Sequence, residues 1–197
     1  MIPFALVPFI EHWISYAWLV LFIFWVLAGV LSKRSVQAQT GTSRLFQAGL
    51  AFTGVMLIFN FNHWFDSGWL AACITPRQVP YVLGGAILTL AGILFSVWAR
   101  AILGSNWSAT VTIKQNHELI RRGPYQIVRH PIYTGFLLGL LGTAFVYGFA
   151  RSFVGVLVVG LAFLLKSQTE ERFMVQQFGE QYLQYRCQVR ALIPYIL

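Results

Sequence analysis

Five long apolar segments dominate this sequence, at about residues 13–31, 45–65, 80–102, 132–149 and 152–166. A helix of about 20 residues crosses the roughly 30 Å hydrocarbon layer of a bilayer. Only 10% of all residues are charged, whereas about a quarter are charged in soluble domains. The pattern predicts an all-α, polytopic membrane protein with about five transmembrane helices. The last two segments are short, and the few residues around Arg151 between them predict an antiparallel helical hairpin.

Basic residues indicate how these spans are oriented. Lysine and arginine gather after the first, third and fifth segments, in Lys33 to Arg44, Arg100 to Arg129 and Lys166 to Arg190. The other two loops hold only Arg77 and Arg151. Because cytoplasmic loops carry the excess of basic residues, we expect the N-terminus outside and the C-terminus inside. The net charge of +8 then reflects topology, and no continuous basic stripe indicates a nucleic-acid partner.

The domain organisation follows from the same pattern. We expect one integral membrane domain, with a three-span part at 1–102 and a part at 103–197 that carries most of the polar chemistry. Two non-spanning segments, Leu103 to His130 and Lys166 to Leu197, fall on the same predicted cytoplasmic side. We therefore expect the loop before the fourth helix and the C-terminal helix to form one cytoplasmic pocket. The sequence carries no signal for an oligomeric state.

The segment Arg121 to Gly135, RRGPYQIVRHPIYTG, places arginines and a histidine directly against an apolar run. Charge at the membrane edge indicates either a functional site or a plain positive-inside anchor. Pro131 suits the first turn of a helix, so the fourth span should start there, with His130 at its boundary. A lone histidine is more often structural than a base or a ligand, and no second histidine or cysteine stands at ligand spacing, so we predict no metal.

Two tyrosines accompany this boundary. Tyr125 follows the turn signal Gly123-Pro124, and Tyr133 lies one turn into the expected helix. Both readings of these side chains, as interfacial anchors or as ligand contacts, remain open.

Beyond the fifth span, KSQTEERFMVQQFGEQYLQYR predicts an amphipathic helix that is interrupted near Gly179. Lys166 and Glu170 are four residues apart and share a helix face. They suit ligand binding at the mouth of a span or, alternatively, a membrane-edge anchor beside a solvated acid. Glu171 points about 100° away from Glu170, and we expect it at the surface.

From about Gly104 to Ile196 the chain resembles the isoprenylcysteine carboxyl methyltransferase family, including its five-span forms, and related phospholipid methyltransferases. The resemblance rests on RHPxYxG, on the following Glu170-Glu171 pair and on FGxxYxxY. It implies S-adenosylmethionine bound in a cytoplasmic pocket, with S-adenosylhomocysteine as the product. It also implies membrane lipids and a lipophilic or prenylated acceptor as partners, the lipid entering between helices.

The resemblance also implies roles for single residues. Lys166 would orient the acceptor as the catalytic, substrate-binding residue, although it stands where the family commonly has arginine, and Gln188 replaces a frequently basic tail residue. Glu170 matches an acidic cofactor contact. The other implied cofactor-binding residues are Thr112, His117, Glu118, Leu119, Ile120, Tyr125, His130, Pro131, Ile132 and Tyr133.

The expected activity is methylation of an isoprenylcysteine-like carboxylate. A carboxylate is already ionised at neutral pH, so positioning and desolvation should dominate the catalysis. Methylation of a phospholipid amine or a thiol is the alternative, and it would need a base. A nicotinamide-dependent sterol reductase and a small lipid-binding or channel-like protein remain as rivals.

Overall fold

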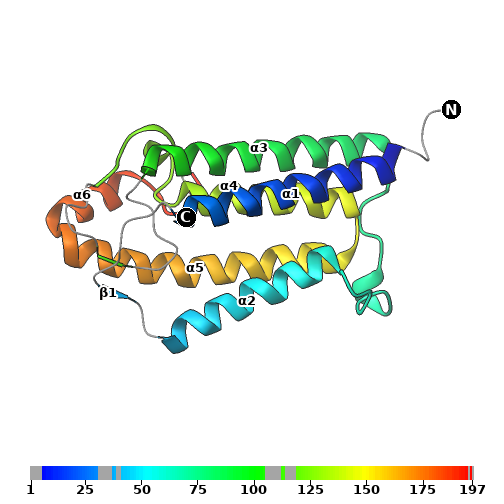
Figure 1. Cartoon of the computed structure of the whole chain (residues 1–197), viewed down its shortest axis with the longest axis horizontal. Coiled ribbons are helices and arrows are strands. Elements are labelled where there is room, and N and C mark those ends of the chain that lie inside the picture. Colours follow the sequence, from blue (N-terminus) through cyan, green and yellow to red (C-terminus); the bar gives the residue numbers. More distant parts are fainter. Residues whose placement is uncertain are drawn as a thin grey trace.

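The structure, a computed structural model, describes residues 6–30, 37–38, 41–104, 112–113, 119–194 and 196. Its helices are α1 (Leu6–Val30), α2 (Gly41–Phe59), α3 (Val79–Leu103), α4 (Pro131–Tyr147), α5 (Ala150–Phe178) and α6 (Glu180–Gln188), with 3₁₀ turns η1 (Trp69–Ala71) and η3 (Gly123–Gln126) (Figure 1). Strands β1 (Gln37–Ala38) and β2 (Thr112–Ile113) form one short antiparallel pair, Gln37 opposite Ile113 and Ala38 opposite Thr112. The all-α prediction is confirmed, and this small β pair was not foreseen.

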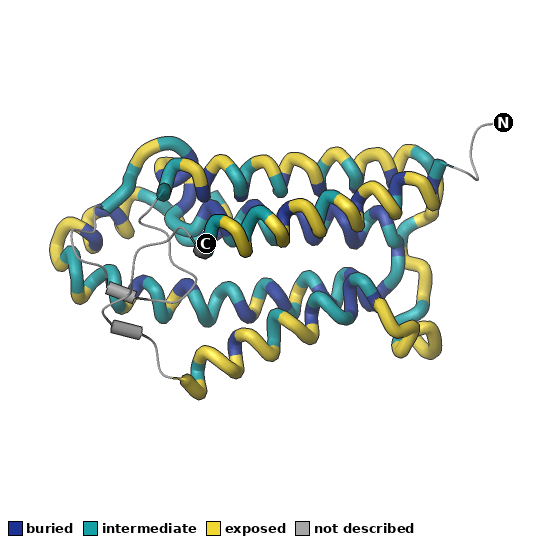
Figure 2. The backbone as a smooth tube through the Cα atoms, in the orientation of Figure 1, coloured by how far each residue is buried: buried dark blue, intermediate teal, exposed yellow. Residues whose placement is uncertain are grey.

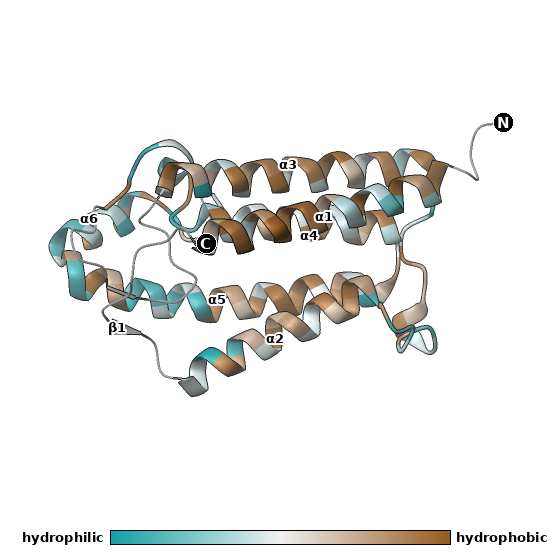
Figure 3. Cartoon of the chain, viewed as in Figure 1, coloured by the Kyte–Doolittle hydropathy of each residue, from teal (hydrophilic) through white to brown (hydrophobic). Residues whose placement is uncertain are grey.

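Five helices account for the five predicted apolar segments. Four of them, α1, α2, α3 and α5, are long and apolar enough to cross a bilayer, and α4 is apolar over 17 residues. Figure 3 shows the hydrophobic colour along these helices and the hydrophilic colour gathered at the α6 end. The expectation of a short fifth span is wrong, because α5 continues for 29 residues without a break. The predicted interruption at Gly179 is confirmed, with α6 beginning directly after it.

Small residues bring pairs of helices into close contact. On α3, a Cβ added to Gly92 would lie 2.3 Å from the backbone nitrogen of Gly139 on α4. On α2, a Cβ added to Gly54 would lie 2.7 Å from the carbonyl oxygen of Gly155 on α5. Only glycine permits such an approach of two helix backbones. The α3–α4 and α2–α5 pairs are therefore the tightly packed units of the bundle.

Helices α1 and α2 pack against different helices of the bundle. Helix α1 packs on α3 and α4, whereas α2 packs on α5. Figure 2 shows long exposed stretches on both helices. Their outward side chains are large and apolar, as expected for residues that face lipid. Other side chains of α1 and α2 line the cavity described below.

Candidate active site

A large cavity of about 1060 Å³ lies between the helices of the bundle. Its wall is contributed by α1, α2, α4, α5, α6, the last residue of α3 and the loop before α4, and most of this wall is apolar. Polar side chains gather at the end where α4 begins and α6 packs, namely Arg129, His130, Lys166 and Glu170. The cavity therefore combines a short polar end with a long apolar interior.

Most of the residues singled out from the sequence lie on this cavity. Thr112 is described only through its backbone in β2, and His117 and Glu118 lie outside the described residues. The remaining nine all line the cavity: Leu119, Ile120, Tyr125, His130, Pro131, Ile132, Tyr133, Lys166 and Glu170. The expectation that the loop before α4 and the C-terminal helix share one pocket is confirmed, because Tyr182 and Tyr185 of α6 line it too.

The start of α4 places His130 and Tyr133. Pro131 is the first residue of the helix and His130 is its N-cap, as the sequence predicted. Upstream, Gly123 has φ of 62°, a left-handed conformation that glycine adopts without strain. The η3 turn that follows buries Tyr125, whose hydroxyl donates to the carbonyl of Ala99 at 3.4 Å. The loop is thus fixed against α3 at Tyr125, and this positions His130, five residues later, on the cavity wall.

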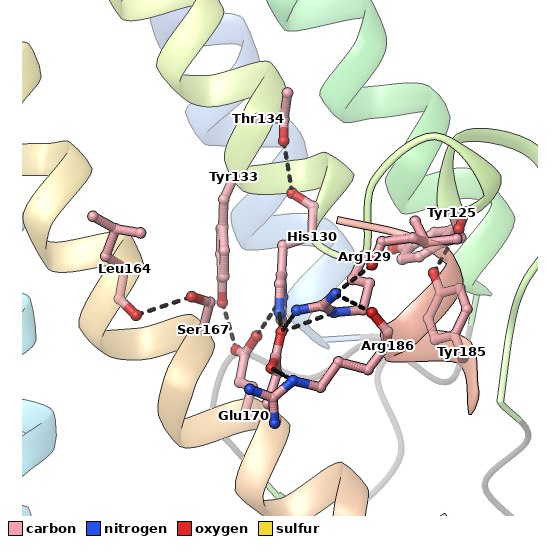
Figure 4. Close-up of polar contacts among 12 residues, drawn as sticks. Tyr125, Arg129, His130, Tyr133, Thr134, Leu164, Ser167, Glu170, Tyr185 and Arg186 are labelled. Atoms are coloured by element: carbon pink, nitrogen blue, oxygen red, sulfur yellow. Dashed lines mark hydrogen bonds and ion pairs between the residues drawn. The ribbon is translucent and has the colours of Figure 1, made fainter. Parts of the chain in front are cut away.

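Glu170 is the carboxylate at the polar end of the cavity. Its Oε1 accepts a hydrogen bond from the Tyr133 hydroxyl at 2.5 Å, and its Oε2 lies 3.3 Å from Nδ1 of His130 (Figure 4). The rings of His130 and Tyr133 stack with their centroids 5.6 Å apart. These contacts hold Glu170 in one orientation while leaving it on the cavity wall.

His130 lies between two carboxylates. Its Nε2 is 3.3 Å from Oε1 of Glu171, on the side opposite to Glu170. Burial alone would lower the pKa of His130, but the hydrogen bonds and negative charges of Glu170 and Glu171 outweigh it and raise the pKa above its ordinary value. The imidazolium form is therefore favoured, and in that form both ring nitrogens donate and neither accepts a proton.

Lys166 lies one helical turn before Glu170. Its ammonium group is 5.5 Å from the centre of the Tyr133 ring, and Tyr133 stacks in turn on Phe163 at 4.7 Å. A cation over an aromatic face is stabilised by the ring quadrupole. This stack fixes a positive charge on the wall where the polar end meets the apolar interior.

The expectation that Glu171 is a surface residue is wrong. Its side chain is only 11% exposed and pairs with Arg129, which donates from Nε at 2.9 Å and from Nη2 at 2.5 Å to Oε1. Arg186 of α6 lies 3.5 Å from its other oxygen. Glu170 and Glu171 do point in different directions from α5, as the helical angle predicted. Glu171 is nevertheless buried, because the loop before α4 and the C-terminal segment pack against its side of the helix.

The C-terminal segment is bound to the loop before α4. The backbone N–H groups of Arg129 and His130 donate to the carbonyls of Arg190 and Ala191 at 2.7 and 3.0 Å. The Thr134 hydroxyl donates to the carbonyl of Leu192 at 2.7 Å, and the Tyr185 hydroxyl donates to that of Tyr125 at 2.5 Å. The tail is therefore fixed against the loop that carries His130.

Several cavity residues were not foreseen. The aromatic side chains of α1, including Trp18 and Trp25, face the cavity but belong to an apolar run that resembles any lipid-facing span. Tyr182 and Tyr185 could have been found from their spacing of three residues, which places both on one face of α6. Among the described residues, no group of three or more His, Cys, Asp or Glu side chains has the arrangement of a metal site.

Comparisons with known proteins support the resemblance inferred from the sequence. The sequence model of the family described as "Phospholipid methyltransferase" matches residues 80–181. Protein-S-isoprenylcysteine O-methyltransferase of Schizosaccharomyces pombe is 40% identical over 96 residues, covering 47% of this chain and 41% of that protein. Protein-S-isoprenylcysteine O-methyltransferase B of Arabidopsis thaliana is 30% identical over 115 residues, covering 57% of this chain and 58% of that protein. The chain thus spans about half the length of the curated relatives it matches.

A solved structure of a methyltransferase shares the fold. The eukaryotic intramembrane Ras methyltransferase, an isoprenylcysteine carboxyl methyltransferase, superposes with a TM-score of 0.50 at 21% identity. The match covers 80% of this chain and 54% of that chain. It supports the architecture of a polytopic helical membrane protein.

Proposed function

The chain belongs to the phospholipid methyltransferase family, and on that premise we propose that it methylates the carboxylate of a lipophilic, isoprenylcysteine-like acceptor with S-adenosylmethionine. The observation that carries the proposal is the continuity of the cavity. One hollow joins Glu170 and Lys166 at the polar end to an apolar interior between α1, α2, α4 and α5. An acceptor with a charged head and a hydrocarbon tail matches both parts.

The polar end fits a sulfonium cofactor. Glu170 offers a fixed carboxylate beside the aromatic face of Tyr133. Carboxylates accept hydrogen bonds from ammonium and hydroxyl groups, and aromatic faces stabilise cations. Leu119, Ile120 and Tyr125 supply an apolar wall close to this carboxylate. The cofactor would supply an electrophilic methyl carbon, which forms a bond to the acceptor oxygen as its bond to sulfur breaks.

The chemistry at the polar end favours a carboxylate acceptor over an amine or a thiol. A carboxylate attacks in its ionised form and needs no base, whereas an ammonium or a thiol must first lose a proton. His130 is held between two carboxylates and favours its protonated form. Glu170 already accepts from Tyr133 and faces His130. Lys166 is left as the charge that would attract and orient the acceptor carboxylate.

The apolar interior favours a lipidic acceptor over a small one. Its volume exceeds the needs of a short thiol, and its wall is mainly aromatic and aliphatic. Several α1 residues on this wall, among them Leu19, Phe22 and Val26, are also more than half exposed at the margin of the bundle. A lipid could therefore reach the cavity from the bilayer beside α1. A phospholipid amine shares this apolar fit, and it remains the second candidate.

The distribution of basic residues supports a cytoplasmic location for the polar end. Five arginines lie in the loop before α4, near the end of α5 and in the C-terminal segment: Arg121, Arg122, Arg172, Arg186 and Arg190. Because lysine and arginine concentrate on the cytoplasmic side of membranes, we infer that α6 and the C-terminus face the cytoplasm. The acceptor head would then meet the cofactor at the inner membrane surface.

The proposal is tested by purifying the chain in detergent and measuring S-adenosylhomocysteine binding by calorimetry. We expect micromolar affinity, about 8 kcal/mol. Labelled methyl transfer is then compared among prenylcysteine analogues, phospholipids and thiols, and we expect a base-labile methyl ester on the prenylcysteine analogue. A labelled phospholipid amine would select the second candidate, and absence of both binding and transfer would contradict the enzymatic assignment.

A further inference from the structure

The far end of the cavity is closed by aromatic side chains. Phe59, the last residue of α2, packs edge-on against Trp18 of α1 and Tyr147 of α4, with ring centroids 6.3 and 6.0 Å apart. It also stacks on Phe61 at 5.4 Å. These four residues are called the aromatic floor. Beyond it lies a packed apolar cluster of α1, α3 and α4 residues, Val7, Ile10, Ile14, Val82 and Val146.

Hydrogen bonds fix this floor in place. The indole N–H of Trp18 donates to the hydroxyl of Thr143 on α4 at 2.9 Å. Thr143 in turn donates to the carbonyl of Gly139 at 2.9 Å, inside the glycine-rich contact between α3 and α4. The Tyr147 hydroxyl lies 3.4 Å from that of Ser15 on α1. These directional bonds hold the rings where simple apolar contacts would let them shift.

The distance from the polar end to the floor is set by α4. Tyr133, which bonds Glu170, and Thr143, which bonds Trp18, both belong to this helix. The ten residues from one to the other correspond to about 15 Å at the helical rise. An extended chain covers about 3.5 Å for every three bonds, so a four-bond isoprene unit covers about 4.5 Å. The space above the floor therefore holds about three isoprene units.

We propose that the aromatic floor limits the length of the acceptor's apolar tail to about three isoprene units, with Phe59 as the specificity-determining residue. This inference rests on the proposed function, because it assumes that the acceptor head lies between Lys166 and Glu170. A tail of this length fills the apolar interior. A longer tail must fold back or leave its last unit out of the cavity, so it loses contacts or displaces the floor.

Two substitutions change the depth of the apolar cavity in opposite directions. Phe59→Ala removes the ring that joins α1, α2 and α4 at the floor and deepens the cavity. Val55→Phe places a ring on the cavity wall of α2, four residues or about 6 Å nearer to the polar end, and makes the cavity shallower by more than one isoprene unit. Phe52→Ala is the matched control, because Phe52 lies on the same helix but is 64% exposed and outside the cavity wall.

The experiment measures kcat/KM for N-acetylcysteine derivatives that carry geranyl, farnesyl or geranylgeranyl thioethers. We expect the unmodified protein and Phe52→Ala to favour farnesyl over geranylgeranyl by about tenfold, the effect of a poorly fitting group in an apolar pocket. Phe59→Ala should abolish this preference, and Val55→Phe should shift it towards geranyl. Ratios between tails on one protein cancel differences in folded fraction.

Unchanged ratios in both cavity variants would overturn the role of the floor while leaving the proposed function intact. The same conclusion would follow if the unmodified protein used all three tails equally, since the tails would then end in the bilayer. If the unmodified protein methylates none of the three derivatives, the proposed function is wrong, and the inference about tail length is wrong with it.

Discussion

Arg129 donates two hydrogen bonds to one oxygen of Glu171, from Nε at 2.9 Å and from Nη2 at 2.5 Å. The two side chains are 8% and 11% exposed. Arg129 also donates to the backbone carbonyls of Arg186, near the end of α6, and of Val189, directly after α6. One buried ion pair thus joins the loop before α4, the end of α5 and the tail.

Breaking this pair should destabilise the protein strongly. Glu171→Gln leaves the Arg129 guanidinium buried without its counter-ion, a change that costs about 3–5 kcal/mol. We expect a clear loss of thermal stability in detergent. Unfolding is measured through the fluorescence of the buried aromatic side chains.

Arg186→Gln is the control for that measurement. Arg186 is the third cation near Glu171, but its side chain is 55% exposed and its Nε is 3.5 Å away. Exposed ion pairs contribute at most about 1 kcal/mol. Equal losses in the two variants would contradict the central role of the Arg129–Glu171 pair.

Protonation of His130 should stabilise the folded state. The raised pKa of His130 means that its stabilising contribution is fully present below its unfolded-state pKa of about 6.5 and is lost as the pH rises through the higher folded-state value. The stability difference between the unmodified protein and His130→Gln should therefore shrink as the pH rises from about 6.5 through the higher folded-state pKa. Thermal unfolding across this range measures it.

The groups that face His130 from its surroundings are Glu170, Glu171, Arg129 and Tyr133. If the stability difference between the unmodified protein and His130→Gln stays constant over the pH range, His130 does not titrate there. A difference that grows with pH would mean that the carboxylates fail to hold the imidazolium.

Lys166 should affect turnover more than cofactor affinity. Lys166→Ala removes the charge that would orient the acceptor, so kcat should fall about 10–100-fold. Its affinity for S-adenosylhomocysteine should change by less than about 0.5 kcal/mol. Lys166→Arg keeps the positive charge over Tyr133 and should recover most of the turnover. An equal loss of kcat and cofactor affinity in Lys166→Ala would contradict the acceptor-orienting role.

Two adjacent glycines on α3 should respond differently to alanine. A Cβ on Gly85 would lie 2.7 Å from the carbonyl oxygen of Gly142, whereas a Cβ on Gly84 would meet nothing within 4 Å. Gly85→Ala should therefore destabilise the protein by about 1–3 kcal/mol through overpacking, and Gly84→Ala should have little effect. Thermal unfolding of the two variants in the same detergent compares them, and similar stabilities would contradict the close α3–α4 contact.

The spans and helix boundaries were largely predictable from the sequence. Hydropathy identifies an apolar segment locally, Pro131 marks the start of α4 and Gly179 interrupts the C-terminal helix, all as observed. The length of α5 was underestimated, because its amphipathic end was separated from the span at Lys166 although no helix-breaking residue stands there.

The surroundings of the site were harder to predict from the sequence than the spans. Glu171 could not be placed from its helical angle, since burial depends on Arg129 and on a tail more than ten residues further along the chain. The aromatic floor was equally hidden, because Trp18 and Phe59 have the same apolar character whether they face lipid or a cavity. Such features require knowledge of which helices are neighbours.

The most direct test of the account is methyl transfer to a farnesylcysteine analogue by the unmodified protein, Glu170→Gln and the exposed control Glu180→Gln. We predict a methyl ester with the unmodified protein and the control, and an S-adenosylhomocysteine affinity that is weaker by about 1.5–3 kcal/mol in Glu170→Gln. A product methylated at nitrogen or sulfur, or a cofactor affinity that Glu170→Gln leaves unchanged, would contradict the account.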